Sequence, residues 1–458
     1  MVVAGAAALV PAAVAGGAKD IRGKSFSFTA TNLLPPVGGF SEPSIALSPK
    51  DHVYFCGPSG LAVDGHVDFV RTPDWATFYR QDITDVPVGG GDCDIKVGPD
   101  AAVYEADLGA YGSAIRKSVD DGATFAQLTY DPVEQDRQWL APDPVDGSIV
   151  YFAYHDFAAE QEILAKSLDG GKTFPIHTLA SNDPLLVPDT GANTYSGPVR
   201  VDPTDHDNVA IVYGISSVGA NTAACNADML CFGLPKTLVV AVSHDGGLTF
   251  TDTVAMDVSD EPGDEILGNL FPWMTWDRAG NLYVMAGLGG TDGAGNRTNG
   301  IYYAFSSDKG AMWSPMRKVN AGGGAVVFPT MVGGSAGVVD FAWLESTAGD
   351  QNDATGTWTV HFAQTRNAAT NAPTFTEVTG PAVRTGPICT LGILCSGGRE
   401  LGDFMEIALD SFGYAHIAAP ALDAVTSYDV WWRQDQGPSA TSEPCTPACV
   451  KVRPGPQP

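Results

Sequence analysis

Short apolar runs recur along the chain in pairs, and a polar, turn-like segment separates the two members of each pair. The first pair is Glu42–Leu47 followed by His52–Phe55, and the second is Asp92–Val97 followed by Ala102–Tyr104. Further pairs begin at Asp136, Gly197, Phe271, Phe328 and Asp403. Apolar, β-branched and aromatic runs bounded by turn residues are typical of β-strands. Seven such units predict an all-β chain, and no stretch keeps helical periodicity beyond a turn or two.

A second repeated phrase follows several of these units. It has the form S-x-D-x-G-x-T-[FW] and occurs at Ser118–Phe125, Ser167–Phe174, Ser243–Phe250 and, more loosely, Ser306–Trp313. An Asp carboxylate can accept backbone N–H groups and close a tight turn, while Gly permits positive φ. We therefore assign a structural role in hairpins to Asp120, Asp169, Asp245 and Asp308.

This phrase resembles the Asp-box, or BNR repeat, of sialidases and related β-propellers. Two degenerate copies are Arg71–Phe78 and a segment that ends at Phe375. The resemblance implies a single propeller of four-stranded blades, with the Asp-box hairpins on the face opposite the ligand site. Seven repeated units favour seven blades, and six, the number familiar from sialidases, is the alternative. The ring must close, and we expect the alternating segment Lys24–Ala30 to supply the missing outer strand.

Propellers bind ligands over the central channel, on the face where the inner strands begin. Carboxylates crowded at such a mouth shift their pKa values apart, which suits general acid and base chemistry. An Arg can recognise carboxylates or sugar hydroxyls, and aromatic faces stack on sugars. The candidate catalytic residues are Asp136, Arg137, Asp403, Glu406 and Glu42. The candidate substrate-binding residues are Tyr154, His155, Asp156, Tyr195 and Trp273.

The resemblance implies an exported, sialidase-like glycoside hydrolase or glycan-processing protein that acts on extracellular carbohydrate. Sialidases carry an F/Y-R-I-P motif and three arginines that hold the substrate carboxylate. This chain has no such motif, since Arg22 stands in Ile-Arg-Gly. Arg137 stands at the entry of an inner strand, and its possible partners, which lie in predicted loops, are Arg80, Arg297, Arg384 and Arg399. The alternative is therefore a non-catalytic exported propeller that binds a glycan or a protein partner. An assembly factor of photosynthetic or sorting type rests on fold analogy alone.

Charge narrows the set of partners. The chain has 458 residues and a net charge of −28, which argues against nucleic acid and anionic membranes. An excess of Asp over Glu fits turn-rich β structure. Clustered oxygen ligands also suit calcium, and Asp257, Asp260 and Asp264 form the best candidate cluster. No other cofactor is required by this interpretation.

The N-terminal residues and the cysteines indicate export. Met1–Ala18 is almost wholly apolar and resembles the hydrophobic part of a signal peptide, and no other segment could cross a bilayer. Eight cysteines predict disulfides, with local bridges Cys225–Cys231, Cys389–Cys395 and Cys445–Cys449, and a longer bridge Cys56–Cys93. The expected organisation is a signal segment at 1–18, a propeller at 19–435 and a Pro-rich tail at 436–458.

Overall fold

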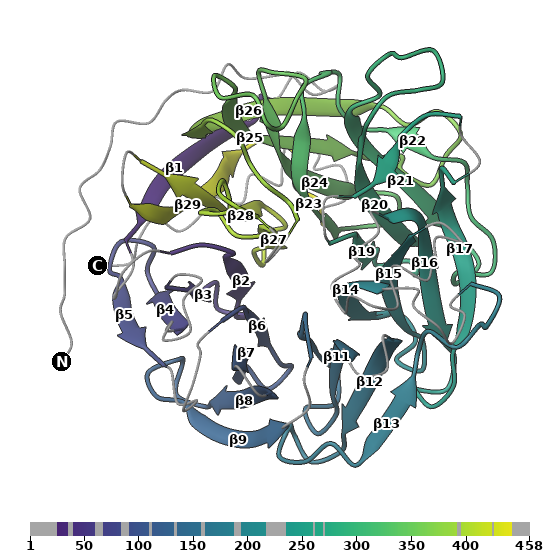
Figure 1. Ribbon diagram of the computed structural model, residues 1–458. Helices are drawn as coiled ribbons and strands as arrows, with labels where there is room; N and C mark the ends of the chain where they lie inside the picture. Colours follow the sequence, from purple (N-terminus) through teal and green to yellow (C-terminus); the bar gives the residue numbers. More distant parts are fainter. Residues whose placement is uncertain are drawn as a thin grey trace, which may run out of the picture.

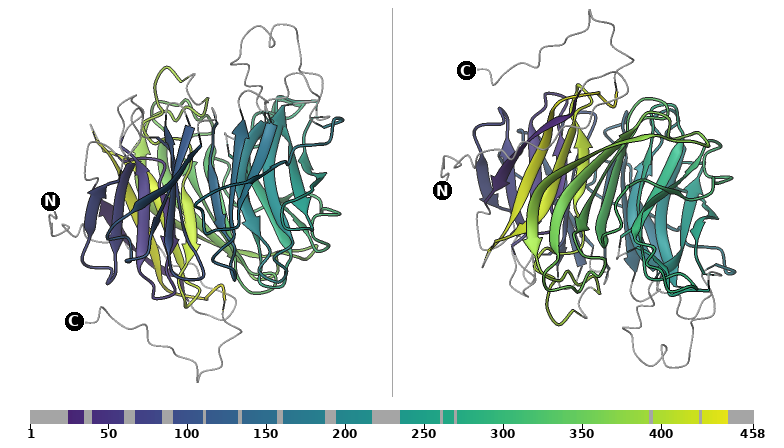
Figure 2. Two further views of the ribbon diagram at one scale, coloured as in Figure 1. Left: turned by 90° about the horizontal axis from the view of Figure 1, so that it is seen from below. Right: turned by 90° about the horizontal axis from the view of Figure 1, so that it is seen from above.

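The computed structural model describes residues 25–34, 40–59, 67–83, 91–109, 112–131, 135–156, 161–186, 194–216, 235–259, 262–268, 271–391, 395–423 and 426–441. These residues form strands and turns, without a helix among them. The strands build seven antiparallel sheets arranged as blades around a central axis (Figure 1). Seven blades confirm the repeat count, and side views show strands running from one face of the ring to the other (Figure 2).

The blades follow one another in chain order, each from its inner to its outer strand. Blade 1 contains β2 (Ser44–Leu47), β3 (Val53–Pro58), β4 (Val67–Thr72) and β5 (Tyr79–Asp82). Blade 2 contains β6 (Cys93–Val97), β7 (Val103–Gly109), β8 (Gly112–Ser118) and β9 (Ala126–Asp131). Blade 3 contains β10 (Trp139–Pro142), β11 (Val150–Asp156), β12 (Gln161–Ser167) and β13 (Ile176–Leu179). Blade 4 contains β14 (Thr194–Val201), β15 (Val209–Ser216), β16 (Pro235–Ser243) and β17 (Thr251–Asp257).

Blade 5 contains β18 (Ile266–Leu267), β19 (Trp273–Trp276), β20 (Leu282–Gly289), β21 (Gly300–Ser306) and β22 (Arg317–Lys318). Its inner edge is made of two pieces, because β18 and β19 both pair with β20. Blade 6 contains β23 (Val326–Gly333), β24 (Val339–Ser346), β25 (Thr357–Thr365) and β26 (Phe375–Thr385), and blade 7 contains β27 (Glu406–Leu409), β28 (Ala415–Leu422), β29 (Ser427–Gln436) and β1 (Ser27–Leu33).

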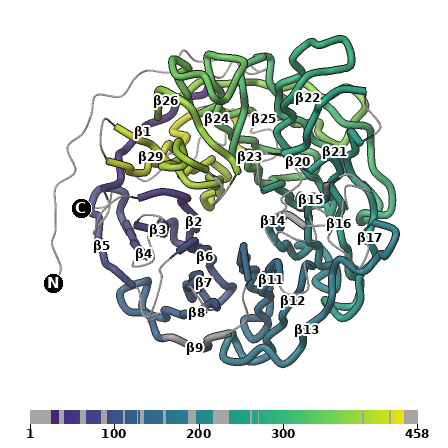
Figure 3. Tube along the Cα trace, viewed as in Figure 1, coloured from purple at the N-terminus to yellow at the C-terminus, as the bar shows by residue number. Residues whose placement is uncertain are grey.

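The N-terminal strand closes the ring. Strand β1 pairs with β29, so the first and last described segments lie side by side in blade 7 (Figure 3). The strand begins and ends three residues later than the predicted Lys24–Ala30, and the expected closure is confirmed. The Phe28 and Trp432 rings stack with centroids 4.2 Å apart, which packs the closing strand into the apolar core.

The repeated phrase folds as turns between the third and fourth strands of its blades. In the first copy Asp120 accepts hydrogen bonds from Ser118 Oγ at 2.8 Å, Thr124 N at 2.9 Å and Thr124 Oγ1 at 2.7 Å. The same contacts surround Asp169 and Asp245, and Asp308 keeps those from Ser306 Oγ and Met312 N. In an antiparallel blade the third strand ends opposite the start of the first, so these turns lie away from the channel mouth.

These hairpins also dock on the preceding blade. Asp121 of blade 2 accepts hydrogen bonds from Tyr54 Oη at 2.7 Å and Arg71 Nη1 at 3.4 Å, both in blade 1. Lys166 Nζ of blade 3 donates to Gly246 O of blade 4 at 2.7 Å. The phrase therefore shapes a turn and fixes the contact between neighbouring blades.

The hairpin carboxylates predict a loss of stability in acid. Their hydrogen bonds hold the pKa values of Asp120, Asp169 and Asp245 at about 2, below the ordinary value of 3.8. A depressed pKa gives stability that is present above about pH 4 and is lost as the pH falls toward 2. We expect Tm to fall over this range, and to fall less in an Asp120→Asn, Asp169→Asn, Asp245→Asn triple variant. Circular dichroism melts measure this, and an equal fall in both proteins would contradict it; Asp205→Asn, at an exposed acid outside the hairpins, is the control.

Two predicted disulfides are confirmed. Cys56–Cys93 joins β3 to β6 across blades 1 and 2, and Cys389–Cys395 closes a short loop before blade 7. The bridges Cys225–Cys231 and Cys445–Cys449, the segment 1–18 and residues 442–458 lie outside the described residues. Among the described residues, there is no helix that is long and apolar enough to span a bilayer.

Candidate functional site

Four acidic residues that precede inner strands gather at one mouth of the channel. Glu42 precedes β2, Asp92 precedes β6, Asp136 precedes β10 and Asp403 precedes β27, so blades 1, 2, 3 and 7 each supply one carboxyl group. The charges of Asp92 and Asp403 both raise the pKa values of Glu42 and Asp136. The structure thus brings together three of the predicted catalytic acids and adds Asp92.

Arg399 is a cation of this cluster that sequence analysis did not place in the site. Its Nε lies 3.2 and 3.1 Å from the two carboxylate oxygens of Asp403, and its Nη2 also donates to Oδ2. The same Nη2 lies 3.9 Å from Glu42 Oε1. The Cys389–Cys395 disulfide closes the loop just before Arg399, and Cys389 N donates to Gly398 O at 2.9 Å. An arginine four residues before a candidate acid, after a close cysteine pair, was the available signal.

Glu42 is fully buried between blades 1 and 7. Its backbone has φ of 47°, and its N–H donates to Leu401 O at 3.3 Å. Gly402 has φ of +74°, and a Cβ there would stand 1.9 Å from Glu42 Cγ. Only glycine leaves room for this side chain. Burial, followed by the charges of Asp92 and Asp403, holds the pKa of Glu42 well above its usual range, and Arg399 opposes that shift.

Asp136 has the environment of a proton donor. Burial is the largest cause that raises its pKa to about 8, and the charge of Asp92 adds to it. The positive charge of Arg137 opposes the shift. A carboxyl group with this pKa keeps its proton at neutral pH, as a general acid must.

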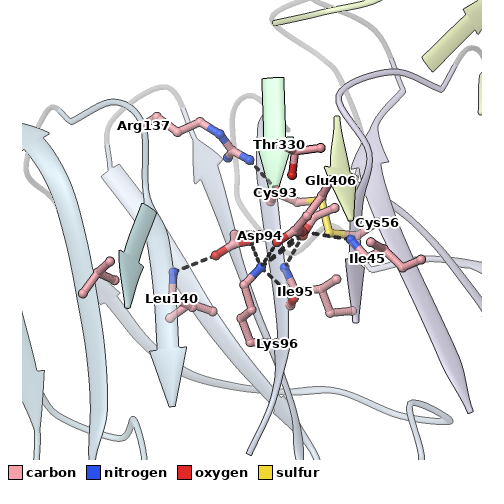
Figure 4. A network of polar contacts seen from close by, with 12 residues as sticks. Ile45, Cys56, Cys93, Asp94, Ile95, Lys96, Arg137, Leu140, Thr330 and Glu406 are labelled. Carbon is pink, nitrogen blue, oxygen red and sulfur yellow. Dashed lines mark hydrogen bonds and ion pairs between the residues drawn. A yellow bond between two sulfur atoms is a disulfide. The ribbon is translucent and has the colours of Figure 1, made fainter. Parts of the chain in front are cut away.

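Arg137 contacts two aromatic rings whose planes are inclined to each other by 68°. Its guanidinium carbon is 4.4 Å from the centroid of Trp139 and 4.1 Å from that of Phe404. Nη2 donates to Cys93 O at 2.8 Å (Figure 4). Nε and Nη1 are buried and find no hydrogen-bond partner among the groups that the structure describes. Two cation–π contacts therefore hold the charged group in place from blades 3 and 7.

Aromatic side chains meet across the channel next to Arg137. The Trp139 ring of blade 3 lies 5.3 Å from that of Trp273 in blade 5 and 5.6 Å from that of Phe404 before blade 7. Phe271 joins them at 5.9 Å from Trp139. Trp139 and Trp273 are fully buried and Phe404 is nearly so. Residues from blades 3 and 5 and from the segment before blade 7 therefore pack together beside Arg137.

A second charged network lies beside the mouth and links the inner strands (Figure 4). Lys96 Nζ contacts Asp94 and lies 2.9 Å from Glu406 Oε1, while Ser44 Oγ donates to Glu406 Oε2 at 2.6 Å. Arg200 Nη2 stands 3.7 Å from Glu406 Oε1. Blades 1, 2, 4 and 7 therefore meet through a balanced set of two cations and two carboxylates.

These side chains also accept backbone N–H groups of the following blade. Glu406 Oε2 accepts Ile45 N at 3.0 Å, Ser44 Oγ accepts Ile95 N at 3.0 Å, and Asp94 Oδ2 accepts Leu140 N at 2.7 Å. Thr330 Oγ1 continues the pattern with Ile407 N at 3.3 Å. Glu406, predicted as catalytic, is thus placed by its contacts among residues that connect neighbouring blades.

The candidate substrate-binding residues are dispersed. Tyr154 packs in the core near Phe152, and its Oη lies 3.4 Å from His177 Nδ1. His155 lies beside the mouth, where its carbonyl accepts Asp136 N at 3.0 Å, and burial lowers its pKa to about 4. Asp156 forms an isolated antiparallel β-bridge with Gln135 through the backbone. Its negative charge raises the pKa of His155 and so opposes the effect of burial. Trp273 belongs to the aromatic cluster, and Tyr195 lies in β14.

Two of the candidate calcium ligands serve other contacts. Asp257 Oδ1 accepts Thr237 Oγ1 at 2.9 Å and Ser259 N at 2.8 Å. Asp264 Oδ1 accepts Thr291 N at 2.5 Å and Thr291 Oγ1 at 2.6 Å. Asp260 lies outside the described residues, so the calcium site stays a prediction.

The fold resembles those of several solved carbohydrate-active proteins. An ulvan lyase of polysaccharide lyase family PL25, bound to -[GlcA(1-4)Rha3S]-, is 12% identical over 86% of this chain and 94% of its own, with a TM-score of 0.50. A Penicillium chrysogenum α-L-arabinanase complexed with arabinobiose is 15% identical over 74% and 92%, with a TM-score of 0.44. A leech intramolecular trans-sialidase complexed with 2,7-anhydro-Neu5Ac is 9% identical over 88% and 70%, with a TM-score of 0.44.

Sequence comparison adds no family to this likeness. No protein-family model matches the chain, and no curated protein matches it. At 12% identity and a TM-score of 0.50, the ulvan lyase supports a likeness of fold alone.

Proposed function

We propose that this chain is a glycan-processing glycoside hydrolase whose site is the carboxyl cluster at the channel mouth. The observation that carries the proposal is the gathering of Glu42, Asp92, Asp136 and Asp403 from four blades at one mouth of the channel. Within this group, burial and then the charge of Asp92 raise the pKa of Asp136 to about 8. An acid that keeps its proton, close to further carboxyl groups, is the arrangement that glycosidic hydrolysis requires.

The remaining residues have supporting roles in this proposal. Asp136 donates its proton to the leaving oxygen, and Asp92 acts on the sugar as base or nucleophile. Arg399 holds Asp403 through several N–H groups and places a positive charge within 3.9 Å of Glu42. The buried aromatic cluster around Trp139 packs beside Arg137 and makes that side of the site apolar.

We also propose that the protein is exported. The two disulfides that the structure describes, Cys56–Cys93 and Cys389–Cys395, are typical of oxidising compartments. A carbohydrate or glycoconjugate outside the cell is then the natural substrate class.

A glycan screen tests the proposed activity. The purified full-length chain is incubated with chromogenic glycosides and intact polysaccharides, and products are followed by colour release and chromatography. We expect product release from at least one glycan class, and its loss in Asp136→Asn. A glycan that raises Tm without being cleaved would favour the alternative of a non-catalytic binding propeller and would contradict the hydrolase assignment.

The proton on Asp136 predicts the alkaline limb of the pH profile. Because only the protonated form can donate, kcat/KM should fall as the pH rises through about 8. Above that value each further pH unit should lower kcat/KM about tenfold. Initial rates across the pH range measure this at substrate concentrations well below KM. A constant kcat/KM up to about pH 10 would show that Asp136 does not supply the proton.

A further inference from the structure

Blade 6 carries a group of metal-ligating side chains away from the channel mouth. Glu345 lies on β24, His361 on β25 and Glu377 on β26. One ligand atom from each residue can be chosen so that all three lie within 4.8 Å of one another. His361 Nδ1 is 3.0 Å from Glu377 Oε1 and 4.0 Å from Glu345 Oε2. The side chain of His361 is 12% exposed, that of Glu377 is 22% exposed and that of Glu345 is 8% exposed. The group is therefore mostly buried but still accessible to solvent.

The imidazole ring of His361 is held with its Nδ1 edge toward both carboxylates. Thr359 Oγ1 lies 3.0 Å from Nε2 at the opposite edge of the ring. The Trp343 ring stacks on the imidazole with centroids 5.4 Å apart. A hydrogen-bond partner on the far ring nitrogen, here the Thr359 hydroxyl, fixes the orientation of a metal-ligating histidine.

A glycine-rich loop covers the two carboxylates and orients them. Asn320 Nδ2 and Trp343 Nε1 each donate to Glu345 Oε2 at 3.0 Å, and Ala321 N donates to Glu377 Oε2 at 3.1 Å. The latter bond leaves Glu377 Oε1 directed at His361. A Cβ at Gly322 would stand 1.8 Å from Glu345 Oε1, so glycine alone allows this close cover. Lys318 Nζ binds Gly322 O at 2.9 Å and is the nearby positive group.

We propose that Glu345, His361 and Glu377 bind a divalent transition-metal ion of the zinc class. In a tetrahedral site with metal–ligand distances of about 2.0–2.1 Å, neighbouring donor atoms stand about 3.3 Å apart. The separations of 3.0 and 4.0 Å from His361 Nδ1 to the two glutamate oxygens lie on either side of that value. One imidazole nitrogen with two carboxylate oxygens suits zinc or its neighbours better than calcium or magnesium, which prefer oxygen alone. The ion would fasten three strands of blade 6 and keep one position for water.

Without an ion, the same side chains form a hydrogen-bonded network in which Nδ1–H donates to Glu377. The two states make opposite predictions for titration of the EDTA-treated full-length chain with ZnCl2 by calorimetry. The proposal expects one zinc ion per chain, and binding weakened at least about tenfold in His361→Gln and in Glu377→Gln. His177→Gln, at an exposed histidine elsewhere, should bind zinc as the wild type does.

Cobalt gives a second readout that does not depend on activity. CoCl2 should produce the strong visible absorption of a tetrahedral ion in the wild type and not in His361→Gln. Circular dichroism shows whether each variant is folded. If His361→Gln does not fold, the isosteric Glu377→Gln replaces it in the test. Absence of stoichiometric zinc binding, or binding that is unchanged in both folded variants, would mean that the network is purely hydrogen-bonded and would overturn the proposal.

Discussion

Replacing Asp136 by Asn should lower kcat about 10²–10⁴-fold on glycans with poor leaving groups, because general acid catalysis contributes that much. The fold should survive the change. Burial raises the pKa of Asp136 to about 8, so the folded chain already favours the neutral side chain. Asn is neutral and nearly isosteric, and it therefore removes the proton donor without placing a new charge in the mouth.

The leaving group separates a chemical role from a structural one. An aryl glycoside whose leaving group needs no protonation should lose much less rate in Asp136→Asn than an alkyl or polysaccharide substrate. The alkaline limb near pH 8 should also disappear in the variant. Steady-state kinetics on matched aryl and alkyl substrates measure both effects. Equal losses on the two substrates, with an unchanged pH profile, would assign Asp136 to positioning.

The blade plan was readable from the sequence because each unit repeats the same local chemistry. Apolar pairs mark the first two strands, and S-x-D-x-G-x-T-[FW] marks the turn before the fourth. The closing strand was predicted from the alternation of Lys24–Ala30, and the structure moves it by three residues to Ser27–Leu33. Such features depend on neighbours in the chain, so a linear pattern contains them.

The site was only partly readable, because its residues are sorted by depth in the channel. Asp92 lies just before β6 and Asp94 lies within it, but Asp92 contributes to the mouth while Asp94 accepts a hydrogen bond from Leu140 N. Asp403 and Glu406 differ in the same way, because Asp403 binds Arg399 at the mouth while Glu406 accepts a hydrogen bond from Ile45 N of the next blade. Arg399 lies between the Cys389–Cys395 disulfide and β27, outside any strand, so strand periodicity does not place it. Depth and loop course are set by packing between blades, which no local pattern records.

The division between Asp403 and Glu406 leads to the second large effect. Replacing Glu406 by Ala should lower the free energy of unfolding by about 3 kcal/mol or more, since removing one partner of a buried ion pair costs about 3–5 kcal/mol. Lys96 and Arg200 lose a common carboxylate, and Ile45 N and Ser44 Oγ lose their acceptor. The lower end of the range applies because Lys96 keeps its contact with Asp94.

Denaturant unfolding measures this loss, and two variants make it specific. Glu406→Gln can still accept Ile45 N, so it should lose less stability than Glu406→Ala. Asp403→Asn should cost least, because burial raises the pKa of Asp403 and disfavours its charged form, although Arg399 then loses a charged partner. Activity per folded molecule should fall in Asp403→Asn and persist in Glu406→Gln. A Glu406→Ala variant that keeps its stability but loses turnover would show that Glu406 is catalytic. The charged network beside the mouth would then belong to the active site.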